Sequence, residues 1–310
     1  MTRIFPAADG HCDFLYGMLE RGYDIAAPVK DQSITLDALI AGGVKLQFFA
    51  AWIDMLLDKN PLCQCTGMID AYYRMLESNP VLTPLTSDFD PASDRIATVL
   101  TVEGGEAIEA NLYNLAILHR LGVRAMTLTW NDVNRLAYPA VKKSKKGLTR
   151  LGREAVAEMC RLGIAVDVAH LNDAGIDDVL SLSTRPIFSS HTNARALCDS
   201  PRCIKDEHIR AISAMGGVIG VNFYYKQLTD KKAATIDDVI AHIAHFIEIG
   251  GVSCVALGSD FDGMNRYIDA LKNSSGFPLI AERLIKLGLN EREVADIMFN
   301  NLYRYILRFI

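Results

Sequence analysis

Residues 149–170 read TRLGREAVAEMCRLGIAVDVAH, and they hold one full repeat of the pattern that runs along the chain. An amphipathic segment, Thr149–Leu162, is followed by Gly163, the residue type that most often ends an α-helix. The apolar run Ile164–His170 comes next, and such runs are typical of strands buried on both faces of a parallel sheet. The stretch therefore predicts a helix that packs beside a buried parallel strand.

Apolar or β-branched runs of this kind occur eight times, with helix-like segments between many of them. The runs are Ile4–Gly10, Val44–Ala51, Ile96–Glu103, Val123–Trp130, Ile164–His170, Pro186–His191, Val218–Asn222 and Val255–Asp260. Helix patterning is also plain in Ala107–Leu121, which Gly122 would end, and in Ile236–Ile249, which Gly250 would end. Eight such repeats predict an α/β fold, the (β/α)8 TIM-type barrel. The alternative is a doubly wound open sheet, which would have a glycine-rich phosphate turn in place of Gly10-His11-Cys12-Asp13.

Two connections between the predicted strands are longer than usual. The first, Asp54–Asp94, is expected to hold a helix around Met68–Leu76. The second, Leu136–Leu148, contains four lysines within residues 142–146, which indicates a solvated segment, with a lid over the substrate as the alternative. No linker, repeat or low-complexity tract divides the chain, so residues 1–310 are expected to form a single barrel domain.

Composition limits the partners of this protein. Half of its 310 residues are hydrophobic, 22% are charged and the formal net charge is −5, which argues against a nucleic acid or an anionic membrane as partner. No stretch approaches the roughly 18 apolar residues that span a bilayer, and residues 1–6 lack the apolar core of a signal peptide. We therefore expect a cytoplasmic protein. Its seven scattered cysteines are expected to be reduced and mostly buried.

Acidic and histidine residues stand at the ends of five of the eight runs. They are His11, Asp13, Glu103, His170, His191 and Asp260. Barrel enzymes build their active sites at the carboxyl ends of the strands, so these side chains are expected to meet although they span 250 residues of sequence. The pattern predicts a metal centre, because imidazole and carboxylate groups are the usual ligands of zinc and similar cations.

Each carboxylate in this set has an expected part. His11 and Asp13 are two residues apart, so in an extended strand both would face one metal while Cys12 points away. Glu103 has two oxygens and could bridge two cations; the alternative is a partner for the dipole of the following helix, a part that Glu106 already fits. Asp260 is expected to be the general base, and Asp262 to stabilise its loop.

The two strand-end histidines are expected to be ligands. A lone histidine on an apolar strand is more often a hydrogen-bonded core residue, but His170 and His191 end consecutive strands beside three carboxylates. The helix-like segments hold His119, His208, His242 and His245, which are expected to be structural or surface residues.

With these residues in place, the chain resembles the membrane (renal) dipeptidase family of the amidohydrolase superfamily over nearly its whole length. The stretches that carry the resemblance are Asp9–Asp13, Val102–Gly105, Gly147–Gly152, Val166–His170, Phe188–Arg195 and Gly258–Gly263. The resemblance implies a metal-dependent hydrolase with two Zn²⁺ per chain. His11 and Asp13 would hold one ion, His170 and His191 the other, and Glu103 would bridge them. It also assigns Arg202 to the carboxylate of the substrate, which suits a planar guanidinium, although by itself Arg202 reads as a surface residue.

The chain departs from the pattern of the renal enzyme after the fourth strand. That enzyme has a histidine that contacts the scissile carbonyl, whereas this chain has Trp130, followed by Asn131. Both residues are expected to face the substrate, but an indole N–H donates one hydrogen bond and cannot exchange its proton. Carbonyl stabilisation would then rest on the metal or on another donor. Cys203, where relatives often carry asparagine, is a smaller departure.

The sequence thus predicts a zinc-dependent dipeptidase that uses a hydroxide bridging two metals. Asp260 would pass the proton to the leaving amine, and the family's acceptance of C-terminal D-residues makes L-Xaa-D-Ala peptides plausible substrates. A related amidohydrolase acting on N-acyl-amino acids or lactones is the alternative that Trp130 motivates. A non-catalytic binding barrel is a remote third hypothesis, because all five metal ligands are present. A homodimer is a family expectation only.

Overall fold

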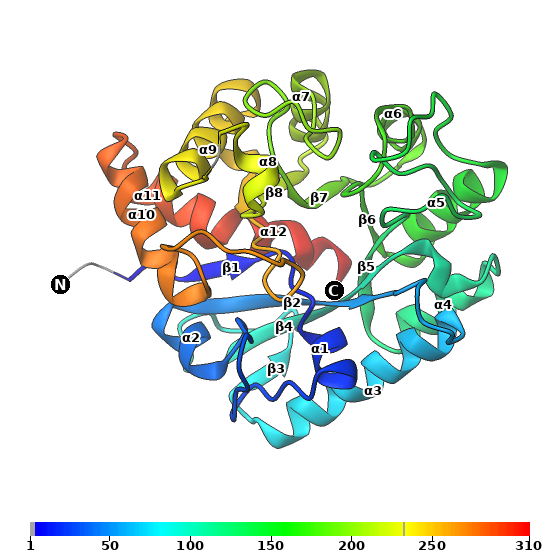
Figure 1. Cartoon of the computed structure of the whole chain (residues 1–310), viewed down its shortest axis with the longest axis horizontal. Helices are drawn as coiled ribbons and strands as arrows, with labels where there is room; N and C mark the ends of the chain where they lie inside the picture. Colours follow the sequence, from blue (N-terminus) through cyan, green and yellow to red (C-terminus); the bar gives the residue numbers. More distant parts are fainter. Residues whose placement is uncertain (1–3, 232) are drawn as a thin grey trace.

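Eight parallel strands close into a barrel in the computed structural model, which describes residues 4–231 and 233–310 (Figure 1). The barrel strands are β1 (Ala7–Asp9), β2 (Val44–Trp52), β4 (Ile96–Glu103), β5 (Val123–Thr127), β6 (Ala165–Asp167), β7 (Phe188–Thr192), β8 (Val218–Val221) and β9 (Val255–Leu257). They pair in the order β2-β1-β9-β8-β7-β6-β5-β4, and a ladder between β2 and β4 closes the ring. The predicted (β/α)8 barrel is confirmed.

The ladder between β2 and β4 fixes the height of the site within the barrel. It runs from Leu46 opposite Ala97 to Trp52 opposite Glu103, so the last residues of both strands reach the same rim. Because every barrel strand is parallel to its neighbours, the carboxyl ends of all eight strands lie at this rim.

A ninth strand, β3 (Leu82–Pro84), was not predicted. It pairs with the beginning of β4, Leu82 opposite Ile96, and lies outside the closed ring. With only three residues, it is too short to carry the apolar signal that identified the other strands.

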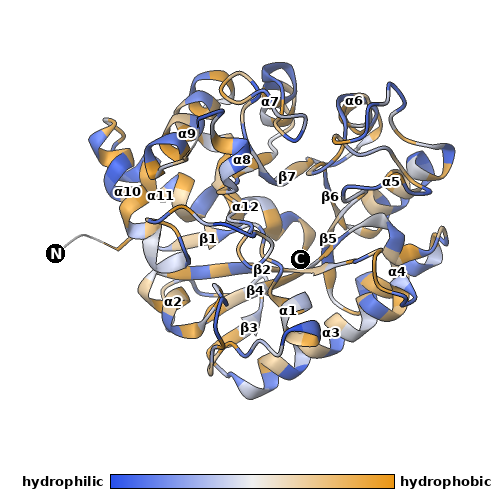
Figure 2. Cartoon of the chain, viewed as in Figure 1, coloured by the Kyte–Doolittle hydropathy of each residue, from blue (hydrophilic) through white to orange (hydrophobic). Residues whose placement is uncertain are grey.

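Helices surround the barrel, and Figure 2 shows that they carry both hydrophobic and hydrophilic residues. They are α1 (Phe14–Glu20), α2 (Leu36–Ala41), α3 (Pro61–Ser78), α4 (Tyr113–Arg120), α5 (Arg150–Leu162), α6 (Asp173–Leu182), α7 (Asp206–Ala214), α8 (Tyr225–Leu228), α9 (Ile236–Gly250), α10 (Phe277–Lys286), α11 (Glu291–Ala295) and α12 (Asn301–Ile306). The helical segments of other types are the 3₁₀ turns η1 (Gly105–Ile108), η2 (Val252–Cys254), η3 (Ser274–Gly276) and η5 (Leu307–Phe309), and the π-helical turn η4 (Asp296–Asn300).

Helix α5 follows the sequence prediction closely. The Thr149 hydroxyl accepts a hydrogen bond from the Gly152 N–H at 3.0 Å and caps the beginning of the helix. Gly163 ends it in the left-handed conformation, with φ of 80°. Helix α3 is longer than the predicted segment Met68–Leu76, because Pro61 occupies its first turn and Asn60 caps it.

The prediction of one helix over Ala107–Leu121 is wrong. The segment contains the short turn η1 and then α4, which begins only at Tyr113. Glu109 and Ala110 lie between them with φ of 49° and 60°, a left-handed conformation that interrupts an α-helix. The apolar spacing continues across the break, so periodicity alone could not reveal it.

The cysteines and the helix lengths agree with the sequence analysis. All seven cysteines are free, and six are buried, whereas Cys63 is exposed. The expectation that most thiols are buried is therefore confirmed. Among the described residues, no helix combines the length and the apolar character needed to cross a membrane.

Candidate metal centre

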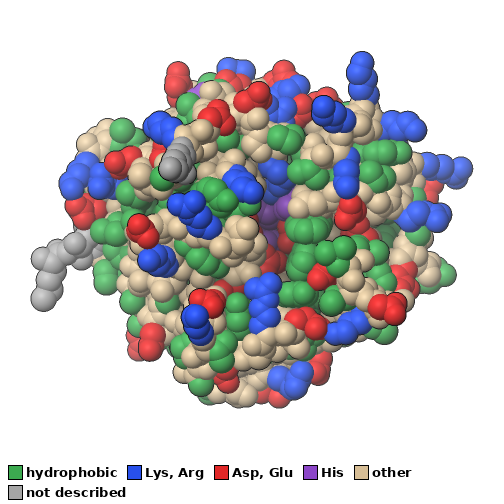
Figure 3. Space-filling view, in the orientation of Figure 1, with side chains coloured by type: hydrophobic (Ala, Val, Ile, Leu, Met, Phe, Trp, Pro, Cys, Tyr) green, Lys and Arg blue, Asp and Glu red, His purple; other side chains and the backbone are tan. Residues whose placement is uncertain are grey.

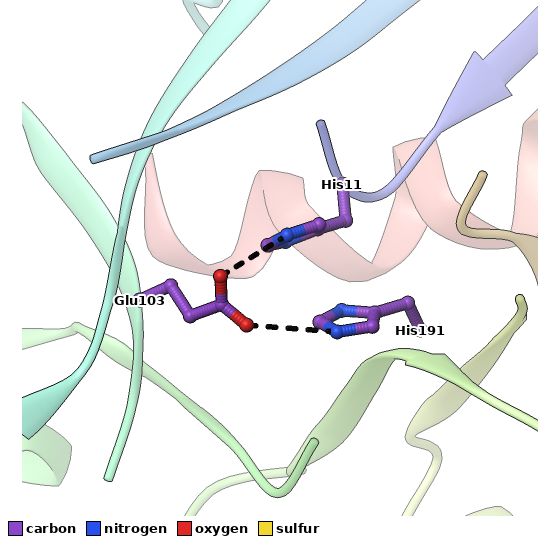
Figure 4. Close-up of side chains that lie close together, drawn as sticks. All are labelled: His11, Glu103 and His191. Atoms are coloured by element: carbon purple, nitrogen blue, oxygen red, sulfur yellow. Dashed lines mark ion pairs between the residues drawn. The ribbon is translucent and has the colours of Figure 1, made fainter. Parts of the chain in front are cut away.

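Five side chains from four strand ends meet inside the carboxyl-terminal mouth of the barrel. The Nε2 atom of His11 lies 3.5 Å from Asp13 Oδ2 and 3.5 Å from Glu103 Oε2. On the other side, Glu103 Oε1 lies 2.9 Å from His170 Nε2 and 3.6 Å from His191 Nε2. Figure 4 shows Glu103 directing one oxygen toward His11 and the other toward His191. One oxygen of Glu103 thus faces the predicted His11–Asp13 ligand pair, and the other faces the predicted His170–His191 pair.

Several of these side chains belong to residues that lie just after the strands, where the backbone is no longer in a regular strand conformation. Strand β1 ends at Asp9, and Cys12 then pairs with Phe261 in an isolated parallel bridge. The thiol of Cys12 donates to the Phe48 carbonyl oxygen at 3.2 Å, so it points away from the metal centre as predicted. His170 and Asp260 have φ of 67° and 64°, a left-handed conformation that is rare outside glycine and is often found at functional sites.

Several polar atoms of the cluster are buried without a hydrogen-bond partner. They are Nε2 of His11, Oδ1 of Asp13 and Oε1 of Glu103. Buried polar atoms in folded proteins are normally hydrogen-bonded, so three unpartnered nitrogen and oxygen atoms in one cluster form a donor set suited to cations. Two sets of ligand atoms lie within 4.8 Å of one another: His11, Glu103 and His191 form the first, and His11, Asp13 and Asp260 the second. These residues fit a pair of divalent cations.

The two histidines from β6 and β7 are held neutral and oriented. Burial lowers the pKa of both His170 and His191 well below the ordinary value. The Nδ1 atom of His170 lies 3.0 Å from Asn131 Oδ1, and Nδ1 of His191 lies 2.8 Å from Ser190 Oγ. These contacts leave both Nε2 atoms, 3.0 Å apart, directed toward Glu103. Neutral imidazole with one nitrogen anchored is the form in which histidine binds a metal.

On the other side of the cluster, His11 lies among the carboxylates of Asp13, Glu103 and Asp260. Burial acts to lower the pKa of His11, but the charges of Glu103 and Asp13 outweigh it and raise that pKa well above its ordinary value. Burial raises the pKa of Glu103 to about 7 and the pKa of Asp260 to about 6. Buried carboxylates with raised pKa values are stabilised in their charged form when cations bind beside them.

Asp260 and Asp262 have different partners, as predicted. The Asp262 carboxylate accepts hydrogen bonds from the backbone N–H groups of Ser33 at 2.7 Å and Ile34 at 3.1 Å. Its loop-stabilising part is therefore confirmed. Both carboxylates line the pocket, but Asp260 lies in the ligand set with His11 and Asp13, and among the described residues it is held through one oxygen, because its Oδ2 accepts a hydrogen bond from Asn222 Nδ2 at 3.1 Å. Of the two carboxylates, Asp260 is therefore the one free to act on a substrate.

A cavity of about 670 Å³ opens above the cluster. Figure 3 shows it as a hollow with histidine side chains at its base. Arg202, Trp130 and Asn131 all line it, so the structure brings the three predicted substrate-binding residues to one pocket. Arg202 is only 8% exposed, and its Nη2 atom has no hydrogen-bond partner. Asn131 has a second contact, because its side-chain oxygen is the partner of His170 described above.

The lysine-rich connection after β5 lies largely in solvent. The four lysines are exposed, and Lys142 pairs with Asp132 at 3.0 Å. The Asn172 side chain donates to the Lys146 carbonyl oxygen at 2.8 Å and anchors the segment. None of residues 142–146 lines the cavity, whereas the preceding residue, Val141, does. The solvated interpretation is therefore favoured over a lysine-bearing lid.

Sequence reasoning missed two buried carboxylates that support the ligands. Asp9 accepts hydrogen bonds from the Ser259 N–H at 2.8 Å and the Ser259 hydroxyl at 2.6 Å, which joins the ends of β1 and β9. Asp167 accepts from the N–H groups of Ala169 and Ser190, both at 2.9 Å, which joins β6 to β7. A charged residue inside an otherwise apolar strand was the signal that could have identified both.

The chain is similar in sequence to known dipeptidases. Dipeptidase 3 of Mus musculus is 30% identical over 98% of this chain, and an uncharacterized dipeptidase of Schizosaccharomyces pombe is 32% identical over 97%. The chain spans 64% of the length of the mouse protein and 80% of the yeast protein.

Solved structures share the whole barrel. A metallo peptidase described as dipeptidase AC has a TM-score of 0.92 with 26% identity, and 99% of each chain is covered. A metallo peptidase from Rhodobacter sphaeroides, liganded with a phosphinate mimic of the dipeptide L-Ala-D-Ala, has a TM-score of 0.91 with 25% identity, covering 99% of this chain and all of that one. The family model for membrane dipeptidase, peptidase family M19, matches residues 1–308. The chain belongs to the membrane dipeptidase family.

Proposed function

We propose that this protein is a zinc-dependent dipeptidase with two metal ions per chain. One observation carries the proposal: Asp13 and Glu103, which hold unpartnered ligand atoms beside His11, line the same cavity as the buried Arg202, whose Nη2 atom has no hydrogen-bond partner. The first feature suits metal-assisted hydrolysis, and the second suits a substrate that ends in a carboxylate. A dipeptide has such a carboxylate next to its only peptide bond.

The ligands would divide between the two ions as the resemblance implies. His11 and Asp13 would hold one, His170 and His191 the other, and Glu103 would contact both through its separate oxygens. Bound zinc would lower the pKa of water toward roughly 7, which supplies a nucleophile at neutral pH, and it would also polarise the scissile carbonyl.

The protein's own groups handle the proton and the orientation of the substrate. Asp260 accepts a proton at its carboxylate and delivers it to the leaving amine, while Asn222 holds one of its oxygens in place. Arg202 binds the free carboxylate and sets the peptide bond against the cluster. Trp130 lines the pocket and can donate one hydrogen bond to the substrate, but its indole cannot exchange protons with it.

Substrates with a C-terminal D-residue are part of the proposal. The likeness to the Rhodobacter sphaeroides enzyme supports it, since that protein was solved with a mimic of L-Ala-D-Ala and shares the barrel over its full length. A screen of L-Xaa-L-Ala and L-Xaa-D-Ala dipeptides beside N-acyl-amino acids and lactones tests both the chirality and the alternative substrate classes. Turnover confined to lactones or acyl-amino acids would overturn the dipeptidase assignment.

The role of Asp260 has its own test. In Asp260→Asn with its full metal content verified by elemental analysis, kcat on a dipeptide is expected to fall at least about 100-fold, the usual contribution of a general base. Asp262→Asn serves as the matched control, because Asp262 also lines the cavity but has both oxygens engaged by the backbone N–H groups of Ser33 and Ile34. Near-normal turnover of a metal-replete Asp260→Asn protein would refute the base assignment.

A further inference from the structure

A row of aromatic rings lines one wall of the cavity and leads away from the metal centre. The Trp130 ring centroid lies 6.2 Å from that of His170, Trp52 lies 4.9 Å from Trp130, and Tyr16 lies 4.7 Å from Trp52. Arg21 continues the row, since its guanidinium carbon lies 5.3 Å from the centroid of the Tyr16 ring. All five side chains line the cavity. This wall therefore begins at a candidate ligand and ends at a cation.

Arg21 forms no ion pair with a carboxylate among the described residues. Its neighbour Glu20 pairs with Lys59 at 2.5 Å. Asp262, whose charge acts on Arg21, has both oxygens occupied by backbone N–H groups. The contacts of Arg21 are the rings of Tyr16 and Tyr23 and a 3.5 Å hydrogen bond to the Tyr23 hydroxyl. Stacking on aromatic rings orients a guanidinium and leaves its N–H groups able to bind an anion.

Arg21 and Arg202 stand on different sides of the mouth. Arg21 follows α1, which leads from β1, whereas Arg202 lies in the loop between β7 and α7. In the closed ring β1 and β7 are separated by β9 and β8, and Figure 1 shows α1 and α7 on opposite sides of the barrel. A dipeptide whose carboxylate is at Arg202 extends its other residue away from Arg202, toward the wall that Arg21 ends.

We propose that Arg21 selects dipeptides with an acidic side chain on the N-terminal residue, of the L-glutamyl class. The methylene groups of that side chain pack against the rings of Tyr16 and Trp52, and its carboxylate meets the guanidinium. This inference rests on the proposed function, and it assigns a specificity-determining residue to the same site. Arg21 is exposed, so the gain is modest, because solvent screens ion pairs at surfaces.

The test compares L-Glu-D-Ala with L-Gln-D-Ala, which have the same shape and differ in one charge. The zinc-loaded protein is expected to show a kcat/KM about fivefold higher for the glutamyl peptide. Arg21→Gln is expected to abolish this ratio and to leave L-Ala-D-Ala unchanged within about twofold, while Arg21→Lys retains part of it. Arg210→Gln is the matched control: Arg210 is an exposed cation on α7 that does not line the cavity, so its removal tests net charge alone.

A binding measurement separates this inference from the proposed function. Calorimetric titration with the phosphinate analogues of L-Glu-D-Ala and L-Gln-D-Ala gives the same affinity ratio whether or not the protein turns over peptides. An equal affinity for both analogues, a ratio that survives in Arg21→Gln, or a ratio lost equally in Arg210→Gln would overturn the assignment. Failure to hydrolyse any dipeptide, with the analogue ratio intact, would count against the proposed function alone. L-Ala-D-Glu carries its acidic side chain on the C-terminal residue. If Arg21→Gln reduced the preference for this peptide and not that for L-Glu-D-Ala, the assignment would also be overturned.

Discussion

The two ends of the barrel differ in whether their buried polar atoms have hydrogen-bond partners. At the amino ends of the strands, the C-terminal segment 296–309 packs Phe299, Leu302 and Ile306 against inward-facing side chains such as Phe48 and Phe188. The polar atoms of this segment have partners there: the Tyr305 hydroxyl donates to Pro186 O at 3.0 Å, and the Asn301 amide donates to Val255 O at 2.9 Å. This end, the barrel floor, is lined by apolar side chains, and the Tyr305 hydroxyl and the Asn301 amide both have hydrogen-bond partners there.

The mouth at the other end leaves polar atoms unsatisfied in a buried place. Atoms of His11, Asp13, Glu103 and Arg202 lack partners there, and ionisable groups crowd within a few ångströms. Such an arrangement lowers the stability of the folded chain, since buried charges without partners are costly. The difference teaches that the floor supplies folding free energy, whereas the mouth holds groups whose partners are ligands and substrate.

Glu103→Gln tests the mouth with the largest expected effect. The amide has the same size but no charge to hold two cations, so activity is expected to fall by at least about 1000-fold, or roughly 4 kcal/mol of transition-state stabilisation. Zinc content by elemental analysis should fall with it. The metal-free variant should unfold at the same or a higher temperature than the metal-free wild type, because a buried carboxylate has been replaced by a neutral group. Full zinc content and normal turnover would contradict the bridging role.

Leu302→Ala tests the floor. Leu302 is 2% exposed within the cluster inside the barrel, so its truncation is expected to cost about 3 kcal/mol of unfolding free energy. Urea denaturation measures this cost. The folded variant should keep the zinc content and the kcat/KM of the wild type, and a variant that is stable but loses its metal would show that the two ends are coupled.

Gly263→Ala is expected to damage the mouth while sparing the fold. A Cβ at this position would lie 2.0 Å from Asp13 Oδ2 and 2.6 Å from Asp260 Oδ1, so these carboxylates would have to rotate. We expect kcat/KM to fall roughly 100-fold, as for small displacements of catalytic groups. The thermal midpoint should change by only a few degrees, and Gly67→Ala, on α3, where a Cβ would approach only the flexible end of the Leu19 side chain at 3.3 Å, controls for the loss of a glycine. Unchanged activity would mean that the present orientation of the Asp13 and Asp260 carboxylates is not needed.

Ser190→Ala gives the smallest effect on the mouth. The Ser190 hydroxyl anchors Nδ1 of His191 at 2.8 Å, and loss of such a support typically weakens metal affinity about 10- to 100-fold. Competition with a zinc chelator measures the affinity. Ser190→Thr keeps the hydroxyl and should restore most of it; an alanine variant with wild-type affinity would show that the imidazole is oriented without the serine.

The barrel and its ligand residues were predictable because both depend on repeated local signals. Buried parallel strands produce the apolar runs, and residues that end such runs must meet at one rim once the strands are parallel. His11, Asp13, Glu103, His170 and His191 therefore needed no contact information to be named together. The break after η1 at Glu109–Ala110 escaped prediction, because the apolar spacing continues across two left-handed residues.

By itself, then, the sequence determined the fold class, the order of the strands and the chemical nature of the cluster at their ends. Only the tertiary structure decided which oxygen of Glu103 faces which histidine, that Asn131 and Ser190 orient the imidazoles, and that Arg21 ends an aromatic wall. The physical reason is distance along the chain: these contacts join residues from different strand ends. Their geometry follows from barrel closure and side-chain packing, which no local pattern encodes.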